Sequence, residues 1–231
     1  MRASSWRKRL CPNSPYPSLT IVPSKYSDQI SIDVPRTSDN PWFLPHEKTL
    51  CGILNTFANV NKSFGYAQGL NFIAFPLFYV FYNDDPKTAV ENTFYALHSV
   101  VRTVLPFYPL DANDTSALEF IRTVASTVRL RCVEMDPSLY IIFEQDYIQF
   151  VESLVSATVP VLYSNTFKLE DTLLLWDDFF ETNSNKELLE KCVHVLSRCI
   201  VSQRNVFLHL RLDKCMAAFH RLLACCIGVV H

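Results

Sequence analysis

Glycine is scarce in this chain, which contains four glycines in 231 residues. The usual glycine-rich nucleotide-binding motifs, G-x-x-x-x-G-K-[ST] and G-x-G-x-x-G, are absent, so we expect the chain to bind no nucleotide of its own. The G-x-S-x-G motif of hydrolases and the H-E-x-x-H motif of zinc proteases are absent too. Two glycines, Gly65 and Gly69, nevertheless lie four residues apart around Gln68. Because glycine adopts positive φ angles without strain, we expect a tight turn there that leads into a buried helix.

Positive charge and long apolar runs are also limited. The net charge is −2 and the pI is near 6.3, which gives no electrostatic reason to expect nucleic-acid binding. We interpret the one basic cluster, Arg7 to Arg9, as a solvated terminus. The longest apolar run, Phe72 to Tyr82, is too short to cross a bilayer, so we expect no transmembrane segment.

Cysteine is present but not in metal-binding patterns. The eight cysteines form no C-x-x-C pair and no metal-type spacing with the six histidines. His194 lies between Cys192 and Cys199, but its side chain points away from theirs on a helix, which favours core packing over a metal site. We therefore expect no metal site, and a cytoplasmic protein with reduced thiols.

The apolar pattern indicates an all-α fold. No segment shows the period-2 alternation of a strand, and the helical stripes predict an irregular array of roughly eight to ten or more helices rather than a four-helix bundle. We expect one domain over residues 1–231, with two helical subdomains as an alternative division. The apolar stretch 222–230 runs into the end of the chain, so a fragment cut within a helix is an alternative to a complete protein. The expected helices cover 47–60, 68–82, a segment from Asp85-Pro86 to Pro106, one from a capping box at Ser116, one after Asp136-Pro137, one around Leu154, 170–181, 186–202 and one from about Asp213.

Residues 1–45 hold seven of the thirteen prolines. This density predicts a largely irregular entry with a helical turn around Trp6. Within it, Pro35 should exclude regular helix and bias Val34 towards extended geometry, which would hold Arg36 outward from a rigid loop. Asp33 could accept backbone N–H groups or pair with Arg36. An ordinary surface turn with a structural ion pair is the alternative, which composition alone favours.

Three short motifs carry a resemblance to a known family. They read R-A-S-S-W over Arg2–Trp6, I-S-I-D-V-P-R over Ile30–Arg36 and Y-A-Q-G over Tyr66–Gly69. Here the sequence resembles the TBC domain, the catalytic module of Rab GTPase-activating proteins, which carries R-x-x-x-W, I-x-x-D-x-x-R and Y-x-Q-G in this order. Ser38-Asp39 departs from the family, which usually has an aromatic residue and a proline after R-T. Leu70 replaces the usual methionine.

The resemblance implies a GTPase-activating protein for a Rab-family GTPase in its GTP form, in vesicle trafficking. Arg36 would be the arginine finger, and Gln68 would orient the attacking water in place of the GTPase's own glutamine. The chain would catalyse no independent reaction and need no cofactor, because the partner carries GTP and Mg²⁺. Recruitment to endomembranes would run through the partner. The residues expected to support the loops or contact the partner are Ile30, Asp33, Thr37, Tyr66, Gly69 and Asn71.

Two other functions stay open. One is a catalytically silent TBC-like module that binds a small GTPase as an effector or scaffold. The other is an all-α adaptor with a peptide groove. The presence of both Arg36 and Gln68 argues against a module that only binds, because binding alone requires neither.

Overall fold

The computed structural model describes residues 2–14, 16–111, 113–140, 143 and 148–205. Nine α-helices and no strand occur in these residues, so the predicted all-α class is confirmed. The helix expected from about Asp213 lies outside the described residues. The α-helices are α1 (Arg2–Leu10), α2 (Ser27–Asp33), α3 (Glu47–Val60), α4 (Leu70–Asp84), α5 (Ala89–Val104), α6 (Ser116–Met135), α8 (Ile148–Thr158), α9 (Leu169–Phe180) and α10 (Asn185–Ser202). The short 3-10 helices are η1 (Val34–Arg36), η2 (Leu44–His46), η3 (Leu105–Phe107), η4 (Pro137–Leu139) and η5 (Val159–Val161).

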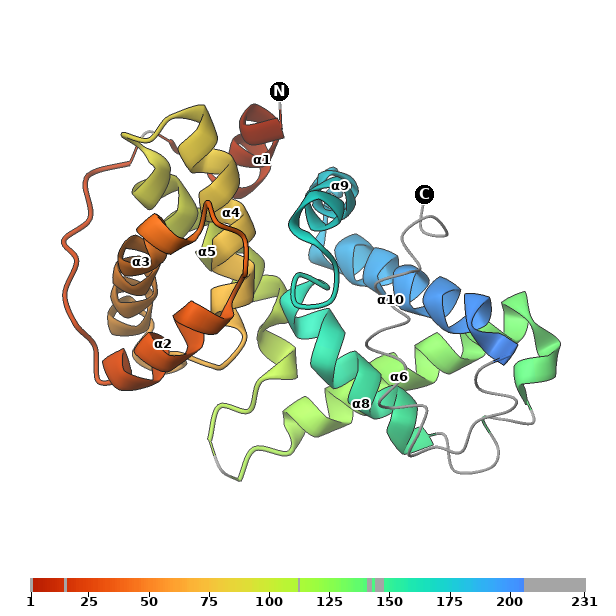
Figure 1. The fold of residues 1–231 in the computed structure, drawn as a ribbon. Coiled ribbons are helices and arrows are strands. Elements are labelled where there is room, and N and C mark those ends of the chain that lie inside the picture. Colours follow the sequence, from red (N-terminus) through yellow and green to blue (C-terminus); the bar gives the residue numbers. More distant parts are fainter. Residues whose placement is uncertain (1, 15, 112, 141–142, 144–147, 206–231) are drawn as a thin grey trace.

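The helices form two groups joined through α9 (Figure 1). In the first group, α4 packs against α3 and α5, and α1 packs against α4 and α5. In the second group, α6 packs against α8 and α10. Helix α9 contacts α1, α4 and α10, so it links the groups. The apolar run that suggested a buried helix is α4, whose side chains are buried on nearly every side because helices surround it.

Both end residues of the R-A-S-S-W motif, Arg2 and Trp6, contact α9. Asp177 of α9 accepts hydrogen bonds from Arg2 Nε at 2.8 Å and from Trp6 Nε1 at 2.9 Å. Trp6 is 1% exposed, and its ring meets Phe180 edge-on at 5.0 Å. The R-A-S-S-W motif therefore joins α1 to α9, and the helical turn expected around Trp6 is part of α1.

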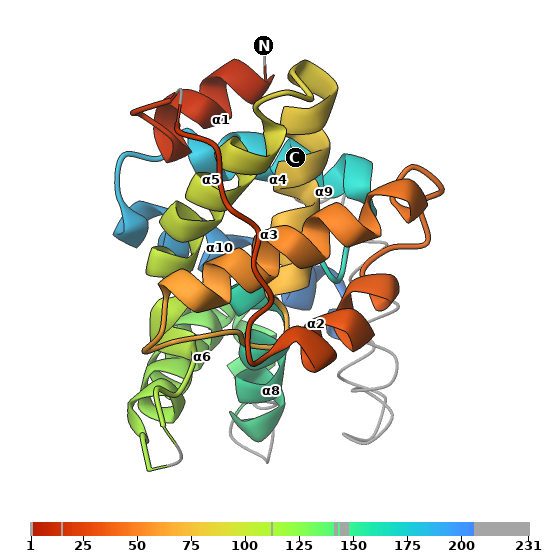
Figure 2. The same cartoon turned by 90° about the vertical axis from the view of Figure 1, so that its left-hand side faces the viewer.

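The entry segment is less irregular than its proline content predicts. It contains α1, α2, η1 and most of η2, while residues 37–43 and the stretch between α1 and α2 lack helix. The stretch between α1 and α2 crosses the outer face of α3 (Figure 2). That stretch is tied down by hydrogen bonds such as Asn59 Nδ2 to the Val22 carbonyl at 3.0 Å. The prediction was wrong because Pro35 and Pro45 sit in the first turns of η1 and η2, where a helix needs no N–H donor.

One predicted cap is also different. Ser116 was expected to cap its helix together with Glu119, but Ser116 is the first residue of α6. Asp114 takes the capping role, because its carboxylate accepts a hydrogen bond from the Ser116 backbone N–H at 2.9 Å. The start of α6 is thus fixed two residues before the predicted cap.

The described cysteines are free thiols. Burial raises the pKa of Cys11 and of Cys132 to about 12, so both act as small apolar side chains. Across the described ranges, no helix has both the length and the hydrophobicity needed to cross a membrane. No group of three or more His, Cys, Asp or Glu side chains is placed to hold a metal ion in the same residues.

Candidate catalytic site

Arg36 projects from the end of a helix rather than from an extended loop. Helix α2 continues into η1 without a break, and Val34 has helical angles, φ −60° and ψ −47°. The predicted extended geometry of Val34 was therefore wrong, because the preference imposed by Pro35 is outweighed by the burial of Val34 and Ile30 in the core. Arg36 is exposed and makes no hydrogen bond or ion pair with any described residue.

Gln68 lies in a turn that requires both of its glycines. Gly65 has φ +70° and Gly69 has φ +105°, which other residues rarely adopt. A Cβ atom at Gly65 would collide with the Tyr26 ring, and one at Gly69 would lie 2.9 Å from Val161 Cγ1. Gln68 itself is exposed at the entrance to α4, and its side chain forms no hydrogen bond with the described residues.

Hydrogen bonds join the arginine helix to the glutamine turn. The Tyr66 hydroxyl donates to Asp33 Oδ2 at 2.9 Å, so Asp33 supports the turn and forms no ion pair with Arg36. Asn71 Nδ2 donates to Thr37 Oγ1 at 3.0 Å and to the Asp33 carbonyl at 3.3 Å. Thr37 and Asn71 are buried, and each is a near neighbour in sequence of Arg36 or Gln68. The network therefore joins the end of η1, which carries Arg36, to the turn that carries Gln68, and both side chains are exposed without partners among the described residues.

Tyr66 is the donor at the centre of this network. It is 5% exposed, so its ring packs inside the protein. Burial, followed by the hydrogen bond to the Asp33 carboxylate, raises the pKa of Tyr66 well above its ordinary value. The hydroxyl consequently stays protonated and donates across the pH range in which the protein would work.

Removing the Tyr66 hydroxyl should loosen the link between the two loops. For Tyr66→Phe we expect a loss of about 1–2 kcal/mol in unfolding free energy, because a part-buried carboxylate loses its donor. If the loops act together on a substrate, kcat should fall about tenfold with little change in KM, since misplacement of catalytic groups slows turnover. Denaturant unfolding and steady-state kinetics measure the two effects. Tyr82→Phe is the control, because its hydroxyl makes no hydrogen bond with the described residues; equal kinetics for both variants would contradict the role of Tyr66.

Two buried polar atoms beside the glutamine turn have no partner among the described residues. They are Asn71 Oδ1 and the Tyr108 hydroxyl, and the hydroxyl lies 3.6 Å from the position of a Cβ on Gly69. Burial raises the pKa of Tyr108, so its hydroxyl is also a protonated donor. Unpaired buried polar groups are uncommon and concentrate at functional sites. Two of the three such atoms in the described residues thus lie at the glutamine turn, and the third, Arg129 Nε, belongs to α6. Sequence reasoning missed Tyr108, which no motif marks.

Another missed feature is a strained turn after η5. Leu162 has φ 49° and Tyr163 has φ 65°, although neither is glycine, asparagine or aspartate. The turn is held by Trp176 Nε1, which donates to the Leu162 carbonyl at 2.9 Å, and by the Tyr163 hydroxyl, which donates to the Cys192 carbonyl at 2.6 Å. The turn places the Val161 side chain close to Gly69. No local sequence signal could have revealed it, because α9 and α10 impose the conformation.

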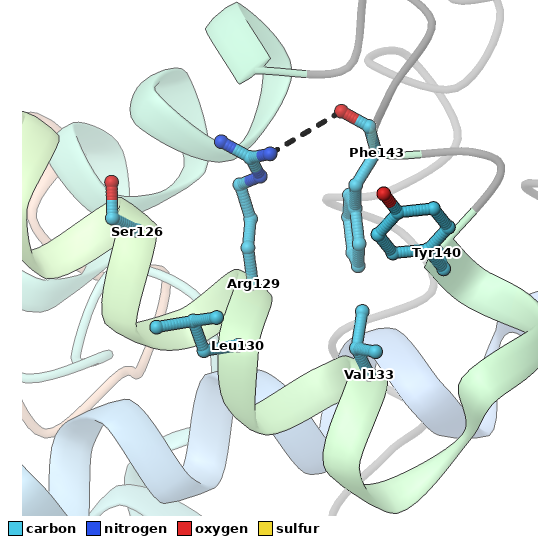
Figure 3. Close-up of a pocket in the computed structure, with 6 residues that line it drawn as sticks. All are labelled: Ser126, Arg129, Leu130, Val133, Tyr140 and Phe143. Atoms are coloured by element: carbon cyan, nitrogen blue, oxygen red, sulfur yellow. Dashed lines mark hydrogen bonds between the residues drawn. The ribbon is translucent and has the colours of Figure 1, made fainter.

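A separate hollow of about 320 Å³ lies on α6 (Figure 3). It is walled by Leu130, Val133, Tyr140 and Phe143, and Arg129 Nη2 donates to the Phe143 carbonyl at 3.4 Å across it. None of the predicted site residues lines this hollow. The catalytic candidates and the largely apolar pocket are thus two different places on the protein.

Comparison with known proteins places the fold and the family of the chain. At the structural level, the crystal structure of the Ypt/Rab-GAP domain of Gyp1p superposes with a TM-score of 0.67 at 18% identity, over 99% of this chain and 78% of that chain. TBC1 domain family member 13 from human and from mouse is each 24% identical over 150 residues. Those matches cover 62% of this chain and 36% of each relative, so the chain spans little more than a third of their length.

The family model of the Rab-GTPase-TBC domain matches residues 12–203. With its helical architecture and most of its length matched in this way, the chain belongs to the Rab-GTPase-TBC domain family.

Proposed function

We propose that the chain is a GTPase-activating protein for a Rab-family small GTPase, to which it supplies Arg36 and Gln68 in trans. The observation that carries the proposal is the arrangement of these two side chains. Both are exposed and unpaired with the described residues, yet the loops that bear them are locked together by the Asp33, Tyr66, Thr37 and Asn71 hydrogen bonds. Exposed and without internal partners, the guanidinium and the amide keep their hydrogen-bonding groups available to a docked protein.

The chemistry of GTP hydrolysis explains why these two residue types suit the task. The transferring phosphoryl group accumulates negative charge on its oxygens, and a planar guanidinium can meet two of them at once. The attacking water needs a fixed orientation, and a glutamine amide can accept a hydrogen bond from water while donating one to a phosphate oxygen. Arg36 takes the first role and Gln68 the second. Docking excludes bulk water, which strengthens both interactions.

The partner supplies everything else the reaction needs. GTP and its Mg²⁺ arrive on the GTPase, so the chain's own residues only stabilise charge, orient water and exclude solvent. Because the chain depends on its partner, it would be recruited to endomembranes wherever the GTP-loaded partner is attached. The competing function is that of a silent module, which binds the GTPase without accelerating hydrolysis. Only the rate of GTP hydrolysis distinguishes the two functions.

A hydrolysis screen tests the proposal. The chain is added in catalytic amount to a panel of GTP-loaded Rab GTPases, and phosphate release is followed. We expect acceleration of at least one member by about 10³-fold or more, the range seen for an arginine supplied in trans. Binding of the GTP form without acceleration would replace the proposal by the effector function, and no binding to any member would contradict both.

A further inference from the structure

Immediately beyond Arg36, the chain forms one wall of a groove. Two adjoining hollows, of about 140 and 400 Å³, share Ser38, Asp39, Lys168 and Leu169. Residues 37–41 make one wall and residues 164–170 the other. The floor comes from the outer side of α4, at Phe72, Phe75 and Pro76.

Three charged side chains line the groove, Asp39 on one wall and Lys168 and Glu170 on the other. All three are exposed, and none of these side chains makes a hydrogen bond or ion pair with the described residues. Asp39 and Lys168 line both hollows, whereas Glu170 lines only the larger one. Neighbouring polar side chains are committed internally. Ser38 Oγ accepts from the Asn40 backbone N–H at 3.1 Å, and Asn165 Nδ2 donates to the Ala157 carbonyl at 3.0 Å. Asp39 and Lys168 are therefore free to contact another molecule.

Both walls are built before any partner binds. Asn40 Oδ1 accepts from the Trp42 backbone N–H at 3.0 Å, and Asn40 O accepts from the Phe43 N–H at 2.8 Å, which fixes the first wall. The strained turn at Leu162 and Tyr163, held by Trp176, leads directly into the second wall. A preformed groove loses little conformational entropy when it is filled.

The position of the groove identifies its occupant. Thr37, next to Arg36 in the chain, lines it, and Asp39 lies at most about 11 Å from Arg36 between Cα atoms, since three residues span no more. On the proposed function, insertion of Arg36 at a bound GTP brings the groove against the loops of the GTPase that flank its nucleotide. We propose that the groove receives one of these loops, and that Asp39 and Lys168 select among GTPases by the charges on it. This inference rests on the proposed function and concerns choice of partner rather than catalysis.

The sequence position of Asp39 agrees with a selective role. Ser38-Asp39 stands where the resembling family usually has an aromatic residue and a proline, so the acidic wall distinguishes this chain. A charge at the edge of an interface acts mainly on the association rate and on its dependence on salt. A change there should consequently alter KM and leave the rate at saturation intact.

Charge reversal tests the inference with the full chain and the GTPase that it stimulates most. For Asp39→Lys and for Lys168→Glu we expect KM to rise about tenfold at low salt, with kcat unchanged, because like charges across an interface are strongly unfavourable. The rise should shrink as ionic strength increases, a response that a purely structural defect would not show. Glu134→Lys, an exposed acidic position on α6, makes the same change of charge as Asp39→Lys outside the groove and should leave KM unchanged.

The possible outcomes distinguish failure of the groove proposal from failure of the proposed function. Unchanged KM in both groove variants, with wild-type stimulation intact, overturns the groove and leaves the proposed function standing. A fall in kcat alone would make the groove part of catalytic positioning and also overturns the selective role. If the wild-type chain stimulates no member of the panel, the proposed function fails and the groove proposal fails with it. Thermal melting of each variant checks that it is folded.

Discussion

Arg36→Ala is expected to reduce stimulated GTP hydrolysis by about 10³-fold or more, the lower end of what an arginine finger contributes. At 1.36 kcal/mol per factor of ten, this is about 4 kcal/mol of transition-state stabilisation. The loss should appear in kcat, because the interaction with the transferring phosphoryl group develops only in the transition state. Single-turnover hydrolysis with the chain in excess measures it directly.

The Arg36 variant should remain folded and able to dock. Arg36 is exposed and has no partner among the described residues, so its removal should change unfolding free energy by less than about 0.5 kcal/mol. Affinity for the GTPase loaded with a non-hydrolysable GTP analogue should be nearly unchanged. Arg36→Lys should recover little activity, because an ammonium lacks the planar fork. Arg122→Ala is the control, an arginine of α6 whose side chain is 57% exposed. Retention of near-wild-type stimulation by Arg36→Ala would falsify the assignment.

Gln68→Ala is expected to lower kcat by about 10²- to 10³-fold, the usual cost of removing one aligned polar group from a reaction centre. Gln68→Glu is the sharper variant, because it keeps the size of the side chain but replaces the amide donor by a carboxylate. It should be at least as inactive as Gln68→Ala, since a carboxylate cannot donate to a phosphate oxygen and adds negative charge beside it. Gln149→Ala, on the exposed face of α8, is the matched control.

A substitution in the partner GTPase gives an independent test of the role of Gln68. If Gln68 replaces the GTPase's own glutamine, stimulation should survive when that glutamine of the partner is changed to alanine. The combination with Gln68→Ala should then abolish it. Loss of stimulation on changing the partner's glutamine alone would show that the water is oriented from the GTPase side, and Gln68 would be left with a docking role.

Local patterns predicted most helices because most of them bury one face, whereas α4 is buried on nearly every side. Residues 47–60 were expected as a helix and are α3, and the predicted segment 186–202 is α10 within a residue. The wrong predictions fall mainly at prolines that were expected to prevent helix. Pro35 and Pro45 start 3-10 helices instead of preventing helix, since a first turn needs no N–H from them.

The sequence named candidate residues for the site, but it did not reveal the hydrogen bonds that connect their neighbours. Motifs pointed to Arg36 and Gln68, and two nearby glycines pointed to a tight turn. They did not show that Tyr66 donates to Asp33 or that Asn71 donates to Thr37, because those contacts join residues more than thirty positions apart. Hydrogen bonds over such separations depend on how α2 and α4 pack, which no local pattern specifies.

By itself, then, the amino-acid sequence determined the all-α class and the positions of most helices, and its resemblance to the TBC domain singled out Arg36 and Gln68 as candidates. The helices follow from periodicity and the tight turn from glycine geometry, both of which operate over a few residues. Only the tertiary structure decided that Arg36 and Gln68 are exposed without partners among the described residues, on segments joined by hydrogen bonds, and that a groove lined by charged side chains begins beside Arg36. It also decided that Leu162 and Tyr163 accept a strained turn beneath Gly69. Those features depend on close packing between distant helices, where neighbouring elements overrule local preference.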